Sequence, residues 1–461
     1  MFTIEQRHVF EKARMSRDAR FDGMFFIGVK TTGIFCRPIC PANSPKEQNV
    51  DYYPSPQQAM ADGYRPCLRC RPDSAPGSFA WIGVSTSQQR ALKLLKDDLD
   101  QSIATVAERM GISERYLHKL VTQVTGVNPK QYRLYSQILL AKQLLHQSAL
   151  SVESVAQASG FSSSRSLQMQ MKKMTGLTPS QIRRTQKTVT ENAIQLRLHF
   201  RPPYNWPLLR DFLANRAISP IEAVTNNSYS KIFNVTQNGS VERFTATYAH
   251  ADNAFDIELY VEDVSRIANV IKTIKRILDL DADPTIIQSS LHACGLSHDS
   301  IDEGIRLPGV WSPFEAGCRA IIGQQISVKA AIQHIQNIVT HLSNDNPAAF
   351  PSPKQIIALD DALLKMPNAR KRALKNFAQC FIDETEPDEK TLLAVKGIGP
   401  WTVNYVKLRG MSDPDLLLET DLIVANQLKA RSLETDSAAP FRSYLTLQLW
   451  QLSGSTQKES S

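Results

Sequence analysis

The pattern of apolar and polar positions changes character along this 461-residue chain. Residues 1–75 mix short apolar and polar runs, whereas apolar residues between 87 and 186 recur at helical spacing. Between 194 and 261 they alternate, as in strands with one buried face. From 307 onward the pattern is helical again, with one long run over 314–342. Because so long a chain exceeds one ordinary core, these changes predict a multidomain α+β protein.

The first helical stretch contains an internal repeat. GISERYLHKLVTQVTGVNPKQYR at 111–133 returns as GFSSSRSLQMQMKKMTGLTPSQIR at 160–183, and a short helix is expected before each copy. A helix, a glycine-containing turn and a second helix form the helix-turn-helix pattern. The second helices are expected near 113–124 and 162–174, where they would enter successive major grooves of DNA.

The charge distribution agrees with a polyanionic partner for this repeat. Residues 85–190 carry 15 Lys and Arg against 6 Asp and Glu, a net charge of +9, whereas 1–84 is net +3 and the remainder is net −4. A solvated lysine-rich surface would give the same numbers, so charge alone leaves both interpretations open.

Four cysteines stand close together in the first 70 residues: Cys36, Cys40, Cys67 and Cys70. They form C-x3-C, a gap of 26 residues and C-x2-C, which is typical of a tetrahedral four-cysteine zinc site. Arg37 follows the first cysteine, and three further arginines surround the second pair. A zinc thiolate among arginines is a nucleophile beside an anion-binding surface, although spacing alone would equally suit a structural zinc knuckle.

The remaining cysteines and the apolar runs bear on the compartment. Cys294, Cys318 and Cys380 have no paired spacing, which suits a reducing cytosol. The first residues have no long apolar run of the kind found in signal peptides. No segment approaches the roughly 20 apolar residues of a membrane span. We therefore expect a cytoplasmic protein with no membrane partner.

A glycine turn and an acid mark the carboxy-terminal helical part. The turn is LAVKGIGPWT, in which Gly397 and Gly399 precede a helix whose first N–H groups can hold a DNA phosphate. Asp421 follows 22 residues after Gly399 and opens the apolar segment DLIVANQL. An acid in that position is compatible with a helix cap alone. A glycine turn between two helices, followed by an acid at the start of a later helix, resembles the pattern of helix-hairpin-helix base-excision glycosylases.

The cysteine segment resembles the zinc domain of the bacterial Ada regulators. The match rests on FCRPIC, with KTTG upstream and GYRPCLRC downstream. The resemblance implies one zinc ion held by the four cysteines and irreversible methyl transfer from methylated phosphate triesters in DNA to Cys36. Thr32 and Arg65 match family positions that approach the DNA backbone.

The repeat resembles the DNA-binding module of AraC-type activators, which also follows the zinc domain in the Ada family. The second copy departs from the family pattern. Leu167 and Met171 stand where phenylalanine is usual, and Met169 stands where arginine is usual. The core substitutions are tolerable. The missing arginine leaves a non-specific DNA anchor as an open alternative to a gene regulator.

The rest of the chain, 194–461, resembles 3-methyladenine DNA glycosylase II. The matching segments are LRLHFRPPYNWPLLRDFLANRAISPIE, IRLPGVWSPFEAGCRAIIGQQIS, GIGPWTVNYVKLRG and FRSYLTLQLW. The resemblance implies that Asp421 is catalytic and that Trp401 and Tyr405 line the base pocket. Gln325 stands at the position of an intercalating leucine, and Phe441 replaces an expected tryptophan and would keep an aromatic in the pocket.

Trp401 also bears on the reaction type. Bifunctional relatives place a Schiff-base lysine at this position of the hairpin, and a tryptophan cannot form an imine. The resemblance therefore implies a monofunctional glycosylase in which water attacks with the help of Asp421. No organic cofactor is expected.

Together these observations predict a fused DNA alkylation-response protein. The expected parts are a zinc methyl-phosphotriester domain (1–76), an all-α tandem helix-turn-helix domain (85–187), a small antiparallel α+β domain (192–305), an all-α helix-hairpin-helix glycosylase body (306–453) and a disordered tail (454–461). The expected partner is double-stranded alkylated DNA, with promoter DNA and RNA polymerase added if the protein activates transcription. We expect a monomer associated with the bacterial nucleoid.

Two alternatives stay open at this stage. One is an alkylation-responsive activator whose glycosylase half is inactive, which the intact hairpin and Asp421 disfavour. The other is a repair enzyme whose helix-turn-helix region only anchors it to DNA.

Overall fold

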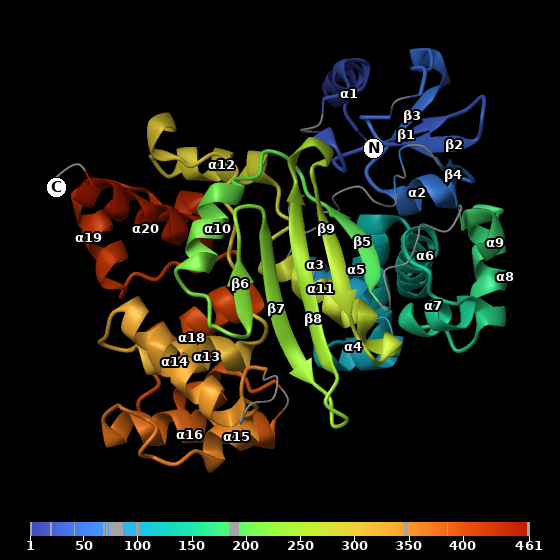
Figure 1. Ribbon diagram of the computed structural model, residues 1–461. Helices are drawn as coiled ribbons and strands as arrows, with labels where there is room; N and C mark the ends of the chain where they lie inside the picture. The colour runs from blue at the N-terminus through green and yellow to red at the C-terminus, as the bar shows by residue number, and fades with distance from the viewer. Residues whose placement is uncertain are drawn as a thin grey trace. The chain divides into compact units, whose positions relative to one another are not determined.

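The computed structural model in Figure 1 describes residues 2–18, 21–40, 42–67, 70, 72, 86–97, 99, 101–183, 193–343, 349–384 and 386–458. Contacts divide the chain into two compact units. The first comprises Met1–Pro202, Ala249–Lys272 and Leu280–Asp283, and the second comprises Pro203–Tyr248, Thr273–Asp279 and Pro284–Ser461. Helices and antiparallel strands alternate along the chain, which confirms the predicted multidomain α+β class.

A four-stranded sheet begins the first unit, with the strand order β3-β1-β2-β4. Its elements are α1 (Ile4–Ser16), β1 (Phe26–Val29), β2 (Ile34–Cys36), β3 (Val50–Tyr53), α2 (Pro56–Ala61) and β4 (Arg65–Pro66). Successive residues of β1 point to opposite faces, so Phe26 and Ile27 enter two separate apolar clusters. Both faces of this small sheet are therefore covered by apolar side chains. Polar groups can gather at the ends of its strands.

The predicted helix-turn-helix repeat is confirmed in the same unit. Its helices are α3 (Thr86–Asp97), α4 (Ile103–Arg109), α5 (Glu114–Thr125), α6 (Pro129–Gln147), α7 (Val152–Ala158), α8 (Ser164–Thr175) and α9 (Pro179–Ile182). The repeated Gly-x-x-Pro has a direct structural cause. Gly126 and Gly176 end α5 and α8 with left-handed φ angles of 75° and 72°, and Pro129 and Pro179 occupy the first turn of the next helix.

The strands expected after residue 194 are also present. In the first unit β5 (Ile194–His199) pairs antiparallel with β9 (Ala254–Tyr260). In the second unit β6 (Glu222–Val224), β7 (Ser228–Val235) and β8 (Val241–Ala249) pair antiparallel in chain order. The helices associated with this region are α10 (Trp206–Ala214), α11 (Ile267–Ile277) and α12 (Pro284–Ala293).

The carboxy-terminal body of the second unit is helical (Figure 1). Its elements are α13 (Pro313–Gly323), α14 (Val328–Ser343), α15 (Pro353–Ala358), α16 (Asn368–Asp383), α17 (Glu389–Leu393), α18 (Pro400–Val406), the π-helical turn Lys407–Met411, α19 (Leu422–Ala430) and α20 (Arg442–Lys458). The buried helix α13 contacts α14, α16 and α18. A Cβ on Gly317 would lie 2.0 Å from the Phe377 ring, so only glycine lets α13 and α16 approach this closely.

Two features of this body differ from the expected pattern. The helical run over 314–342 is split, because α13 ends at Gly323 and Gln325 takes a left-handed φ of 60° before α14 begins. The disordered tail expected at 454–461 is corrected in part, since α20 continues through Lys458. Extending an existing helix needs no new nucleation, which accounts for this continuation. Residues 459–461 lie outside the described residues.

Candidate metal centre and glycosylase site

The four predicted cysteine ligands come together at one end of the amino-terminal sheet. Cys36 ends β2, and Cys67 follows β4, which runs parallel to β2 and is joined to it by a bond from the Cys67 N–H to the Phe35 carbonyl at 2.9 Å. The Cys40 N–H donates to the Arg37 carbonyl, and this bond closes a turn that brings Cys40 back toward Cys36. The four Sγ atoms all lie within 4.8 Å of one another.

This donor set fits zinc. Tetrahedral Zn–S bonds of about 2.3 Å place sulfur atoms roughly 3.8 Å apart, which matches such a cluster. Hydrogen bonding from Cys36 lowers the pKa of Cys40 to about 7, whereas hydrogen bonding with Cys40 raises the pKa of Cys36. A divalent cation bound by all four sulfurs stabilises each of them as a thiolate. The site therefore holds one zinc ion.

The sulfur atoms differ in their surroundings. Cys67 and Cys70 are buried, each 8% exposed, whereas Cys36 is only partly buried. The Arg37 N–H donates to Cys70 Sγ at 3.3 Å, and its guanidinium pairs with the buried Asp22. Cys40 is partly buried like Cys36, so the first cysteine pair is more accessible than the second.

The two predicted backbone-contacting residues lie at the start of β2, at the turn that joins it to β1, whereas Cys36 ends this strand. Thr32 and Arg65 are both exposed, and the Arg65 N–H donates to the Gly33 carbonyl at 2.8 Å. Arg65 also stands opposite Ile34, two residues before Cys36. Their contacts with DNA stay a prediction.

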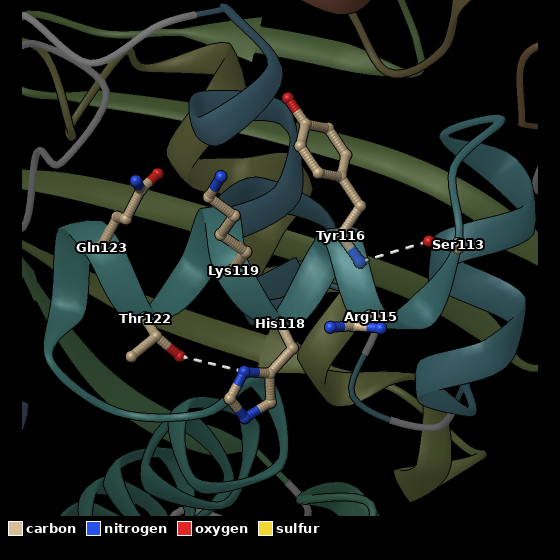
Figure 2. Close-up of a pocket in the computed structure, with 7 residues that line it drawn as sticks. All are labelled: Ser113, Arg115, Tyr116, His118, Lys119, Thr122 and Gln123. Carbon is tan, nitrogen blue, oxygen red and sulfur yellow. Dashed lines mark hydrogen bonds between the residues drawn. The ribbon is translucent and has the colours of Figure 1, made fainter.

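The first recognition helix presents a polar face to solvent. Figure 2 shows a hollow on α5. It is lined by Ser113, Arg115, Tyr116, His118, Lys119, Thr122 and Gln123. Ser113 caps the helix by accepting from the Tyr116 N–H at 3.2 Å, and Tyr116 remains 47% exposed. These are donor, acceptor and aromatic groups of the kind that read base edges.

The second recognition helix has the same division into faces. Leu167 and Met171 are fully buried in α8, so both substitutions relative to the family pattern fill the core as expected. Met169 is 60% exposed, together with Lys172 and Lys173 on the solvent side. This face therefore keeps cations for phosphates but has an apolar side chain where the family has arginine.

The glycine turn has the geometry that a phosphate-binding hairpin requires. Gly397 takes a φ of 96° between α17 and α18, and Gly399 is the N-cap of α18. Pro400 occupies the first turn of α18, which begins directly after the turn. Trp401 stands in that first turn, so its indole is fixed relative to the hairpin.

Asp421 is both a helix cap and the centre of an aromatic site. Its Oδ1 accepts from the Ile423 and Val424 N–H groups at 3.1 and 3.3 Å, which is the capping expected from sequence. Two indole N–H groups also converge on the carboxylate: Trp401 on Oδ2 at 3.3 Å and Trp450 on Oδ1 at 3.1 Å. A cap needs neither indole, so these contacts fix the orientation of the carboxylate beyond what capping requires.

Aromatic rings extend from Asp421 on both sides. Trp401 stacks on Tyr405 with ring centroids 5.2 Å apart, and Trp450 stacks on Phe212 at 6.5 Å. Trp450 and Phe212 were not expected from the sequence. They come from α20 and α10, far from the hairpin in the chain, and no local motif marks them. Stacked rings of this kind suit an electron-poor purine.

Two guanidinium groups border these rings. Arg216 lies 3.7 Å from the Phe212 ring centroid, and Arg409 donates to the Tyr405 hydroxyl at 3.1 Å. Burial lowers the pKa of Arg216 to about 10. Burial alone would raise the pKa of Tyr405, but the charges of Arg409 and Arg216 outweigh it and the pKa is lowered.

Two other predicted site residues lie in different settings. Phe441 is 2% exposed, and its ring meets Tyr444 edge-on at 6.2 Å. Its place in the base pocket stays a prediction, whereas Trp450 supplies an aromatic group in contact with Asp421. Gln325 is exposed in the loop between α13 and α14, and its intercalating role stays a prediction.

Three family models match successive parts of the chain. They are the metal binding domain of Ada at 10–73, a helix-turn-helix domain at 89–185 and the AlkA N-terminal domain at 195–312. A Mycobacterium tuberculosis protein named probable bifunctional transcriptional activator/DNA repair enzyme AlkA is 31% identical over an alignment 475 positions long, which covers 95% of this chain and 95% of the relative. The chain belongs to this bifunctional AlkA family.

Other relatives match parts of this AlkA-family chain. DNA-3-methyladenine glycosylase 2 of Escherichia coli is 30% identical over 279 residues, covering 56% of this chain and 97% of the relative. The bifunctional transcriptional activator/DNA repair enzyme Ada of the same species is 33% identical over 169 residues, covering 37% of this chain and 47% of the relative. Among the described residues, no helix is both long and apolar enough to cross a bilayer.

Proposed function

We propose that this protein repairs and senses alkylated DNA by two reactions. The carboxy-terminal body releases N-alkylated purines of the 3-methyladenine type by hydrolysis. The zinc domain takes a methyl group from methylated phosphate triesters on Cys36. The observation that carries the first reaction is the Asp421 carboxylate held between two tryptophan indoles, and the relatives named for glycosylase activity support it.

The chemistry of base release follows from this geometry. Alkylation puts positive charge on a purine ring and weakens its bond to the sugar. The nucleotide leaves the helical stack, and the electron-poor base is held between aromatic faces such as those of Trp401 and Trp450. As the bond breaks, positive charge moves to the sugar, where the Asp421 carboxylate stabilises it and orients the attacking water.

The methyl transfer is a direct displacement. The Cys36 sulfur attacks the methyl carbon, an S–C bond forms, and the C–O bond breaks. The phosphate oxygen leaves with the electron pair, so an ordinary anionic phosphodiester is restored. When bound, zinc keeps the four cysteines deprotonated at neutral pH. Thr32 and Arg65 hold the DNA backbone against the sulfur.

The type of glycosylase has a simple test. Because Trp401 occupies the hairpin position where a lyase has lysine, wild-type protein should release the base and leave an intact abasic site. It should not form a covalent adduct with DNA under borohydride. Strand cleavage and trapping are measured on one alkylated duplex, with a bifunctional glycosylase as the positive control. A trapped adduct would refute the monofunctional mechanism.

Methylation of Cys36 should act as a switch. It converts a thiolate to a neutral thioether and removes one negative charge that faces DNA. We expect DNA affinity to rise on the order of tenfold near 0.1 M salt, as for one added phosphate contact. Affinities of methylated and unmethylated protein are compared at one salt concentration, with protein incubated with undamaged DNA as the control. Equal affinities would favour a helix-turn-helix region that only anchors the protein to DNA over one that regulates genes.

The regulatory half of the proposal extends to further partners. An activator would bind promoter DNA through α5 and α8 and would contact RNA polymerase. The protein would act as a monomer at the nucleoid. The alternative of an inactive glycosylase half is disfavoured by the convergence of Trp401 and Trp450 on Asp421.

A further inference from the structure

The loop that carries Gln325 is held in an unusual conformation. Gln325 has a left-handed φ of 60°, which residues with a Cβ rarely adopt. The residue before it is fastened to the hairpin helix, because Gln324 Nε2 donates to Thr402 Oγ1 at 3.3 Å. Backbone conformations of this kind persist when the surroundings impose them, and they concentrate at functional sites.

The Gln325 side chain has a partner that determines its orientation. Arg370 Nη2 donates to Gln325 Oε1 at 2.9 Å. A guanidinium has only donors, so it must face the carbonyl oxygen of the carboxamide. The amide N–H2 group of Gln325 is thereby turned away from Arg370. The pairing selects one of two carboxamide orientations that otherwise differ little in shape.

The helix that carries Arg370 also contacts the hairpin. Ala373 stands one turn further along α16, on the same face as Arg370. Its Cβ lies 3.0 Å from the position that a Cβ on Gly397 would occupy. One short stretch of α16, from Arg370 to Ala373, therefore contacts both the loop of Gln325 and the Gly397 turn.

We propose that Arg370 is a positioning residue that presents Gln325 to DNA as a hydrogen-bond donor. This rests on the proposed glycosylase function and on Gln325 filling the duplex where the damaged nucleotide leaves. Every base offers an N3 or O2 acceptor in the minor groove. A donor amide can therefore bond to the unpaired base whatever its identity, which an apolar plug cannot do.

The competing interpretation is an exposed polar pair of no consequence, since many surface contacts contribute nothing measurable. The two interpretations differ in whether the effect of removing Arg370 depends on the presence of the Gln325 side chain. If Arg370 acts through the Gln325 carboxamide, its removal should matter only while that carboxamide is present.

The test uses the full-length zinc-loaded protein and a duplex with one 7-methylguanine next to 2-aminopurine. Single-turnover base release and 2-aminopurine fluorescence are measured for Arg370→Ala, Gln325→Ala, Gln325→Glu and the double alanine variant. Arg372→Ala is the matched control, because it removes an equal charge from an exposed position of the same helix.

We expect Arg370→Ala to lower base release and the fluorescence rise by roughly fivefold to tenfold, the size of one oriented hydrogen bond. Gln325→Glu keeps an acceptor for Arg370 but loses the donor, so it should be impaired like Gln325→Ala. Arg370→Ala should add nothing in the Gln325→Ala background, and Arg372→Ala should behave like wild type.

An equal effect of Arg370→Ala and Arg372→Ala would overturn the proposal, as would an undiminished effect of Arg370→Ala in the Gln325→Ala background. Wild-type activity of Gln325→Glu would show that no donor is needed and would overturn it too. Failure of the glycosylase function itself is distinguished by the wild-type protein, which would then release no base from the same duplex.

Discussion

Asp421→Asn is expected to lower base release from alkylated DNA by on the order of 10²–10³ and to leave binding of damaged DNA largely intact. Asparagine has the shape of aspartate and retains one acceptor oxygen, so the indole and cap contacts on one side survive. The negative charge that stabilises the sugar cation is lost. The new amide also places a donor against an indole N–H, which removes the orientation that water needs.

Base release from methylated duplex DNA measures this effect under single-turnover conditions, alongside affinity for the same DNA. Asp388→Asn is a matched control, because Asp388 caps α17 by accepting from the Thr391 N–H at 2.7 Å and stands outside the aromatic site. The control should retain wild-type activity. Near-wild-type release by Asp421→Asn would mean that another group among 306–450 is catalytic.

Exposure to DNA that carries methyl phosphotriesters is expected to place one methyl group per chain on Cys36. Cys36 is the acceptor position of the FCRPIC motif and is partly exposed, whereas Cys67 and Cys70 are buried. Cys40 is also partly exposed, so the motif and not burial separates it from Cys36. Cys36→Ser should abolish transfer, because a serine hydroxyl is neither a thiolate nor a good zinc ligand. Peptide mass mapping identifies the acceptor.

Loss of zinc provides a second readout of the same centre. A strong chelator should abolish transfer and destabilise residues 1–72, because the sulfur atoms then share protons and the small sheet loses its metal cross-link. Cys380→Ser is the control for a partly exposed cysteine outside the cluster and should still transfer methyl normally. A methyl group on Cys67 or Cys70, or on no cysteine, would contradict the assignment of Cys36.

Much of the candidate site could be predicted because its signals are local. The cysteine spacing predicts a four-sulfur cluster, and the structure confirms that the Sγ atoms converge. The hairpin fixes Trp401 and the cap fixes Asp421, and these two residues are in contact. Their catalytic roles stay predictions.

Other features of the site have no local signal. Helical periodicity shows that Trp450 belongs to a partly buried helix but not which carboxylate its indole meets. Phe441, nine residues earlier, is a pocket residue in the sequence-based prediction, and its ring packs against Tyr444. The difference depends on how α20 is turned relative to α19, which is a property of the whole helical body.

The sequence by itself determined the order of the parts, the metal ligands and the two helix-turn-helix copies. Each of these is marked by short motifs whose residues lie close together in the chain. Tertiary structure alone decided which rings surround Asp421 and which side of the Gln325 carboxamide faces outward. These contacts join segments 20 to more than 200 residues apart, such as Trp401 with Asp421 and Trp450 with Phe212. Periodicity states which face of a helix is buried, whereas only packing states what that face is buried against.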